Sequence, residues 1–312
     1  MNLHLNKELF KEIIDTLNTR SGIAIDIIEK DYYVCLILED LSKKQDYLKA
    51  YFKGGTAIYK ILDTMNRFSE DIDLTVRMQE DESNTRNRKR LKESALSYKL
   101  DGLDLSKEEC IDNKGSVTGI YKYISAYSNS EIPLQRAGKI QVEATSFTVS
   151  EPVEKCIIEP LIYKLSNDVE KKILEERFDV SKIEIEVIKL ERMFIDKIFA
   201  AEFYYIRQMF TDVSKHLYDI SILFANDKIQ KLLNDKGELN KLVQYKRQEE
   251  KFRIGGIDEN TQIKDFNYFK LNFSDDLIRE FEKMQSKYVL DNKYRISITD
   301  VKEILRQIYN KM

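Results

Sequence analysis

Residues 52–76 read FKGGTAIYKILDTMNRFSEDIDLTV, and this stretch decides the expected fold. The glycine pair Gly54-Gly55 follows a short apolar segment and precedes a helical pattern, which predicts a tight turn between a strand and a helix. Beyond that helix apolar and polar residues alternate, which predicts a second strand with Asp71 and Asp73 on one face. A glycine turn and two carboxylates are therefore expected on rigid elements that are close together in the chain.

Hydrophobic periodicity extends this unit and predicts an α+β fold, in which a short mixed β-sheet flanked by helices precedes a mainly helical C-terminal domain. The predicted strands are 50–53, 71–77, 117–127 and 138–149. The predicted helices are 7–18, 24–42, 56–62, 191–208, 211–225, 226–233, 237–250, 274–285 and 298–311, with a solvated helix within 80–100. The expected domains are 1–170 and 171–312.

Composition indicates an ordered, soluble protein. Hydrophobic residues make up 42% of the 312 residues, and prolines and glycines are few, so the chain is able to build a core. The net charge of −3 excludes a surface that is basic throughout. Two histidines and three scattered cysteines, Cys35, Cys110 and Cys156, argue against a zinc site and for reduced thiols. No long apolar run occurs, so we expect a cytoplasmic protein without a membrane partner.

The two aspartates are candidate metal ligands. Residues i and i+2 of a strand share a face, so Asp71 and Asp73 are expected to hold one Mg²⁺ (or Mn²⁺) together. Magnesium prefers one or two carboxylates combined with substrate phosphates. Glu143 is a candidate third ligand, because it lies on the polar face of the predicted strand at 138–149. The alternatives are a solvated acidic strand edge and, for Glu143, one polar residue on a half-exposed strand.

The glycine turn is a candidate phosphate site. Gly54 and Gly55 let the backbone approach a ligand closely, and the N-terminus of the following helix favours anions. The hydroxyl of Thr56 is able to donate to a phosphate, although threonine is also an ordinary helix N-cap. The pattern is neither a Walker A motif nor a dinucleotide-binding GxGxxG motif.

These features together resemble the signature of the nucleotidyltransferase superfamily, and more narrowly that of the AbiEii/AbiGii toxin family, the type IV toxin nucleotidyltransferases. Three further segments support the narrower resemblance. Residues 29–33 (EKDYY) resemble the EKDY helix of the family, 194–200 (FIDKIFA) its (E/D)KxxA helix, and 215–220 (KHLYDI) its (R/K)HxYDL helix. The C-terminal helix around 281–284 (FEKM) is compatible with the same family.

The resemblance implies roles for two residues of the helical half, which would contribute the second half of the active site. Lys197 is implied to contact the triphosphate, whereas the sequence alone favours a lysine that reaches to solvent. Asp219 is implied to be an essential acid that orients Lys197 or the acceptor. The alternative for Asp219 is an i,i+4 ion pair with Lys215. A lone helical histidine is usually structural, and His216 is expected to be so.

The resemblance also implies an activity. It predicts a Mg²⁺-dependent transfer of NMP from an NTP, with GTP or CTP favoured, to an RNA acceptor, the 3′ end of tRNA. Such a toxin would block translation and growth in an abortive-infection system that defends against phage. A cognate antitoxin from the same operon would counter it, without a direct complex being required.

Two other functions stay open from the sequence. One is a small-molecule nucleotidyltransferase of the aminoglycoside-modifying kind, and the other is a non-catalytic nucleotide or RNA binder. The basic run 86–92 fits either a solvated helix face or an RNA contact. Tyr121, Tyr123 and Tyr127 fit either strand packing or base stacking.

Overall fold

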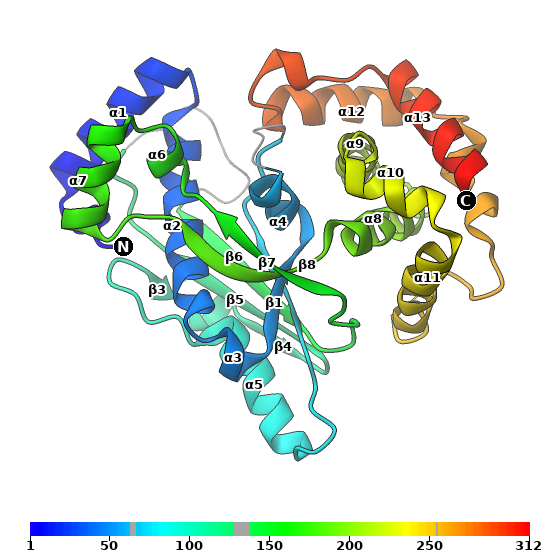
Figure 1. The fold of residues 1–312 in the computed structure, drawn as a ribbon, viewed down its shortest axis with the longest axis horizontal. Helices are drawn as coiled ribbons and strands as arrows, with labels where there is room; N and C mark the ends of the chain where they lie inside the picture. Colours follow the sequence, from blue (N-terminus) through cyan, green and yellow to red (C-terminus); the bar gives the residue numbers. More distant parts are fainter. Residues whose placement is uncertain (63–66, 128–137, 254) are drawn as a thin grey trace. The chain divides into compact units, whose positions relative to one another are not determined.

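The computed structural model describes residues 1–62, 67–127, 138–253 and 255–312, and these form two compact units (Figure 1). The described residues of the first unit are 1–62, 69–127, 138–146 and 153–187. Those of the second unit are 67–68, 147–152, 188–253 and 255–312.

The first unit combines helices with a β-sheet. Its helices are α1 (Lys7–Ser21), α2 (Ile25–Ser42), α3 (Gln45–Leu48), α4 (Gly54–Ile61), α5 (Asn84–Leu96), α6 (Leu161–Lys164) and α7 (Asp168–Phe178). Its strands are β1 (Ala50–Lys53), β2 (Ile72–Val76), β3 (Asp104–Leu105), β4 (Ile111–Asn113), β5 (Ser116–Lys122), β6 (Lys139–Thr145), β7 (Val153–Ile158) and β8 (Ile183–Ile188).

The described strands form one mixed sheet in the order β3-β5-β6-β2-β1-β8-β7, with β4 paired to β5. Strand β2 runs antiparallel to β1 and parallel to β6. Helix α4 packs on β1, β2 and β7, while α5 packs on β2, β5 and β6. The predicted fold, a mixed sheet flanked by helices, is therefore confirmed.

The centre of the sheet is apolar because the hydrophobic residues of β1 and β2 are buried. Phe52, Ile72 and Leu74 have no exposed surface, and Phe52 lies opposite Leu74 in the ladder. Asp73 stands between the two buried residues of β2 and points to the other face of the sheet, as the period of a strand requires. The hydrophobic residues of β2 thus fix the orientation of its acidic residue.

The structure differs from the sequence prediction at several ends. Strand β5 ends at Lys122 and β6 at Thr145, earlier than the predicted 127 and 149. Helix α7 and strands β7 and β8 had not been predicted. Strand β8 does alternate apolar and acidic residues (IEIEVI), whereas β7 lies at the edge of the sheet and is only half-buried.

The division between the units follows from these strands. Strand β8 pairs in parallel with β1, with Phe52 opposite Val187, so the chain stays in the first unit up to Val187. The predicted boundary at 170/171 lies before this strand. A short stretch at 147–152 belongs to the second unit, although it precedes β7 in the chain.

The second unit is helical. Its helices are α8 (Leu190–Tyr205), α9 (Phe210–Phe224), α10 (Asp227–Asn234), α11 (Lys236–Glu250), α12 (Asp275–Tyr288) and α13 (Ile298–Lys311). Helix α9 packs against α8, α12 and α13 and buries Leu217, Ile220 and Leu223 completely. Asn226, Asp235, Ser274 and Ser297 cap four of the helix N-termini with their side chains, which explains why these helices begin close to their predicted positions.

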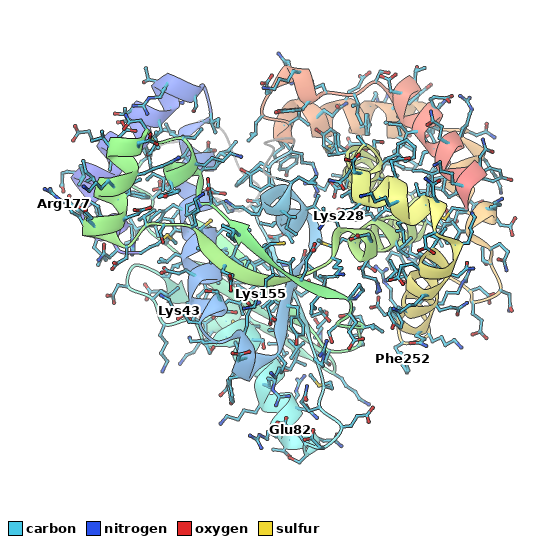
Figure 2. All side chains as sticks on the ribbon, in the orientation of Figure 1. Lys43, Glu82, Lys155, Arg177, Lys228 and Phe252 are labelled. Carbon is cyan, nitrogen blue, oxygen red and sulfur yellow. The ribbon has the colours of Figure 1, made fainter. Side chains whose placement is uncertain are left out.

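The surface of the first unit is charged, as Lys43 on its α2–α3 connection and Arg177 on α7 illustrate (Figure 2). Among the described residues, no helix is both long enough and apolar enough to cross a membrane.

The central position of β2 generates a stability prediction. Leu74→Ala should lower the free energy of unfolding by about 2–5 kcal/mol, because it leaves a cavity in a packed core. Ile157→Ala, at a 64% exposed position of β7, is the matched control and should cost less than about 1 kcal/mol. Urea unfolding measures both values, and equal effects would contradict this account of the core.

Candidate functional site

The turn between β1 and α4 brings the backbone against a carboxylate. Gly54 has φ +83°, and a Cβ atom built on it would overlap the carboxylate of Asp73. Both the positive φ and the contact require glycine at this position. The start of α4 is therefore pressed against the acidic face of β2, and Gly54, Gly55 and Asp73 are all half-buried there.

Strand pairing places further polar residues beside Asp73. Its partner on β6 is Glu143, and its partner on β1 is Lys53. Residues directly opposite each other in a sheet point to the same face, so the three side chains leave the sheet together. Asp71 precedes β2 by one residue and is half-buried. The predicted residues Asp71, Asp73 and Glu143 thus lie along two adjacent strands.

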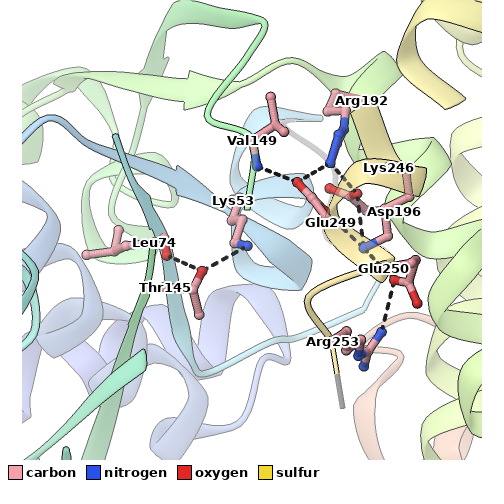
Figure 3. Close-up of polar contacts among 10 residues, drawn as sticks. All are labelled: Lys53, Leu74, Thr145, Val149, Arg192, Asp196, Lys246, Glu249, Glu250 and Arg253. Atoms are coloured by element: carbon pink, nitrogen blue, oxygen red, sulfur yellow. Dashed lines mark hydrogen bonds and ion pairs between the residues drawn. The ribbon is translucent and has the colours of Figure 1, made fainter. Parts of the chain in front are cut away.

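Lys53, which was not predicted, lies beside Asp73 in the candidate site. Its ammonium donates to the Thr145 hydroxyl over 3.4 Å, and that hydroxyl donates to the Leu74 carbonyl over 3.2 Å (Figure 3). The only signal in the sequence is its position directly before Gly54. A cation in register with Asp73 reduces the negative charge of the acidic face.

The Thr56 hydroxyl is buried. The side chain is 1% exposed, and the hydroxyl donates to the backbone carbonyl of Asp71 and lies 3.0 Å from the Ser69 hydroxyl. It therefore ties the first turn of α4 to the segment that leads into β2. For an anion, the donors at this helix start are the backbone N–H groups of Gly54 and Gly55, since the first N–H groups of a helix lack partners within it.

The acidic face fits a magnesium ion that is shared with a polyphosphate. Asp71 and Asp73 offer carboxylate oxygens, which are the ligands Mg²⁺ takes one or two at a time beside phosphate oxygens. The described residues contain no cluster of three or more His, Cys, Asp or Glu arranged to hold a metal by themselves. Glu143 lies beside Asp73 in register without completing such a cluster.

In the second unit, Asp219 binds two cations. Its carboxylate accepts two hydrogen bonds from the Arg67 guanidinium, both 2.8 Å long, and lies 2.8 Å from the Lys197 ammonium. All three side chains are at least nine-tenths buried. The pairing of Asp219 with Lys197 was expected only from the family resemblance, and Arg67 was not predicted as a partner. Its expected alternative partner, Lys215, pairs instead with Asp212 at 3.6 Å.

The charges around Asp219 set its protonation. Burial alone would raise the pKa of this carboxyl, but Arg67 and Lys197 outweigh burial and hold the pKa well below its usual range. For nearby His216, burial and then the charge of Lys197 lower the pKa far below the ordinary value. His216 is neutral at pH 7 and stacks on Tyr204 with ring centroids 5.3 Å apart, which is a structural arrangement.

Helix α8, which carries Lys197, is itself held by buried ion pairs. Arg192 on α8 binds Glu249 on α11, and Lys246 lies 3.0 Å from both Glu249 and Glu250 (Figure 3). Glu249 also accepts a hydrogen bond from the backbone N–H of Val149, at 2.6 Å. These contacts fix the orientation of α8 within the second unit.

The basic run 86–92 is engaged in ion pairs of the first unit. Arg86, Arg88, Lys89, Arg90 and Lys92 of the basic run each form an ion pair, with Glu82, Asp112 or Glu93.

The tyrosines are likewise engaged within the first unit. Tyr121 is buried and its hydroxyl donates to the Ala95 carbonyl. Tyr123 stacks on Tyr33 with centroids 4.0 Å apart. Tyr127 donates to Asp15. Tyr121 and Tyr123 are thus part of the core rather than a platform for a base.

Gly54 provides a direct test of the turn. Gly54→Ala should destabilise the protein more than Gly22→Ala, because both positions have positive φ but only the Cβ at 54 meets another group. We expect about 1–2 kcal/mol for Gly22→Ala from backbone strain and a larger loss for Gly54→Ala. Chemical denaturation compares them, and equal losses would show that Asp73 does not press against this turn.

The pairing of Asp219 with Arg67 and Lys197 predicts how stability depends on pH. A depressed carboxyl pKa contributes stability above the unfolded pKa, about 3.9, which is lost only as pH falls through the folded value. Asp219→Asn leaves two buried cations uncompensated and should cost about 3–5 kcal/mol. That cost should be the same at about pH 5.5 and pH 8. Asp212→Asn, on the same helix at a surface pair, should cost under about 1 kcal/mol. Thermal and urea unfolding at both pH values check this, and a cost that shrinks by pH 5.5 would refute the depressed pKa.

Comparison with known proteins agrees with the expected family. The family model described as nucleotidyl transferase AbiEii toxin, type IV TA system, matches residues 36–306. No curated protein matches the chain. Among solved structures, the chain is similar to MenT4, a nucleotidyltransferase toxin from Mycobacterium tuberculosis H37Rv, with 12% identity and a TM-score of 0.42 over 96% of this chain and 98% of that one. So low a TM-score carries no weight, and the assignment rests on the family model. The chain belongs to the AbiEii family of nucleotidyltransferase toxins from type IV toxin–antitoxin systems.

Proposed function

We propose that this nucleotidyltransferase moves an NMP from an NTP to the 3′ end of tRNA and releases pyrophosphate. The observation that carries the proposal is the contact between the Gly54 backbone and the Asp73 carboxylate. It joins a helix N-terminus suited to phosphate oxygens with the segment 71–76, on which Asp71 and Asp73 would bind the metal. A nucleoside triphosphate with its metal ion requires both features side by side.

The first unit would bind the donor. Backbone N–H groups of Gly54 and Gly55 would hold phosphate oxygens, and Asp71 and Asp73 would hold Mg²⁺ or Mn²⁺. When bound, such an ion polarises the phosphoryl oxygens and offsets their negative charge. Glu143, beside Asp73, is proposed as an outer support or a further ligand. The buried Thr56 hydroxyl keeps the glycine turn attached to the metal-binding segment.

The second unit would supply positive charge. Lys197 is proposed to contact the triphosphate, and Asp219 to orient its ammonium through their 2.8 Å ion pair. In the reaction an acceptor hydroxyl oxygen bonds to the α-phosphorus and loses its proton, while the bond to the bridging oxygen breaks and pyrophosphate departs. Negative charge builds on that leaving group, where a fixed cation stabilises it most. Arg67 would hold Asp219 in place by its two hydrogen bonds to the same carboxylate.

The biological setting that we propose is growth arrest. Modified tRNA would no longer support translation, and the arrest would limit phage infection. A cognate antitoxin from the same operon would counter the toxin without necessarily binding it. GTP or CTP are the donors that we favour.

The activity test uses each of the four α-³²P-labelled NTPs with total tRNA and Mg²⁺. Wild type should label tRNA with one NTP, and Asp73→Ala should lower the rate by at least about 100-fold, since it removes a metal ligand. Asp104→Ala, at an exposed position of β3, is the matched control and should retain full activity. Gel autoradiography and removal of Mg²⁺ by EDTA complete the measurement.

Other outcomes point to the two alternatives. Label that appears on a small molecule instead of tRNA would favour a small-molecule nucleotidyltransferase. No label, together with growth arrest that survives Asp73→Ala, would reject catalysis as the cause of toxicity and favour a binding protein.

A further inference from the structure

Helix α2 sends two consecutive charged side chains to two different elements of the proposed donor site. Lys30 and Asp31 belong to the EKDY segment, which precedes the residues matched by the family model. They are 0% and 1% exposed. Adjacent residues on a helix diverge by about 100°. Neither residue takes part in the donor site as described so far, so their charges require an explanation.

Lys30 holds the segment that leads into the metal-binding strand. Its ammonium forms an ion pair with the carboxylate of Glu70, whose side chain is 7% exposed. Glu70 is the chain neighbour of Asp71. A movement of Glu70 would therefore move the backbone that carries Asp71, whose carbonyl already accepts the Thr56 hydroxyl.

Asp31 holds the helix that follows the glycine turn. One of its oxygens lies 2.5 Å from the ammonium of Lys60, on the last turn of α4, and the other accepts the Leu161 N–H over 2.6 Å. Lys60 also donates to the Glu159 carbonyl over 2.9 Å. The far end of α4 is thus tied to α2, while its first turn presents Gly54 and Gly55.

Stability is a weak explanation for two such pairs. Moving charges out of water costs several kcal/mol per ion, and well-packed apolar residues of similar size usually stabilise a core equally well. Polar pairs do, however, fix one geometry, since an ion pair has a narrow range of distances and angles and an apolar contact does not. The pairs therefore suit a place where the relative position of two elements matters.

We propose that Lys30 and Asp31 are positioning residues for nucleotidyl transfer. Lys30 sets the position of Asp71 through Glu70, and Asp31 sets the glycine turn through Lys60. This inference rests on the proposed function, because it assumes that Asp71 and Asp73 bind the metal and that Gly54 and Gly55 bind phosphate. It adds α2 to the residues on which donor binding depends.

The test removes both charges of a pair, so that no unpaired charge remains in the core. The variants are Lys30→Met/Glu70→Leu and, for the second pair, Asp31→Asn/Lys60→Met, in which the new amide keeps an oxygen acceptor for the Leu161 N–H. The control is Arg90→Met/Glu82→Leu, which removes a largely buried ion pair of the same unit that touches neither motif. Each full-length variant is measured by thermal unfolding, by Mn²⁺ binding in electron paramagnetic resonance with a non-hydrolysable NTP analogue, and by transfer kinetics.

If Lys30 and Asp31 are positioning residues, the two double variants should differ in which ligand they bind more weakly. Lys30→Met/Glu70→Leu should weaken Mn²⁺ binding and raise the half-saturating Mg²⁺ concentration by about tenfold, as loss of an outer-shell support does. Asp31→Asn/Lys60→Met should instead weaken binding of the analogue by about tenfold. The control should retain wild-type binding even if its melting temperature falls. Wild-type binding in both test variants would overturn the inference and leave a purely structural role.

Two further results distinguish a failure of the positioning role from a failure of the proposed function. A wild-type protein that binds no Mn²⁺ with the analogue would refute the proposed function itself. If Lys30→Met/Glu70→Leu does not fold, Glu70→Asp replaces it, because this variant keeps the charge and shortens the side chain by one methylene. Glu70→Asp should then weaken Mn²⁺ binding, and unchanged binding would overturn the inference for Lys30.

Discussion

The contact between the Gly54 backbone and the Asp73 carboxylate is the constraint on which the proposed site depends. It exists because Gly54 has no Cβ and adopts a positive φ. Strand β2 must bury Ile72 and Leu74 to aim Asp73 at the turn, and β1 must lie antiparallel to it so that the turn starts in register with Asp73. The core of the sheet and the chemistry of the turn are therefore set by the same pairing.

Several buried charges around the residues with proposed roles form ion pairs. Asp219 binds Arg67 and Lys197, Arg192 binds Glu249, and the EKDY segment binds Glu70 and Lys60. Such pairs contribute little net stability compared with an apolar core but are costly to break singly. They limit the geometries that each unit can adopt. Arg67 and Lys197 keep Asp219 ionised, whereas burial and then the charge of Lys197 keep His216 neutral.

Much of the fold was predictable from local patterns. Strand β1 has its predicted bounds, and α8, α9 and α13 begin within a residue of the predicted positions, because apolar periodicity acts over a few positions. Ser297 in addition caps α13. Strand β7 was missed because an edge strand carries only weak alternation. The first unit extends to Val187, beyond the expected boundary at 170/171, because β8 joins the sheet through β1, a pairing of residues far apart in the chain.

The sequence by itself determined the glycine turn, the acidic strand and the family, because each depends on residue types at short, fixed spacings. Only the tertiary structure decided which partners these residues have. Arg67 meets Asp219 across a separation of 152 residues, and Lys60 meets Asp31 from another helix. Likewise, the Thr56 hydroxyl donates to the backbone carbonyl of Asp71, fifteen residues further along the chain. The packing of the whole unit determines which partner a charged side chain meets, and a short sequence pattern does not predict that partner.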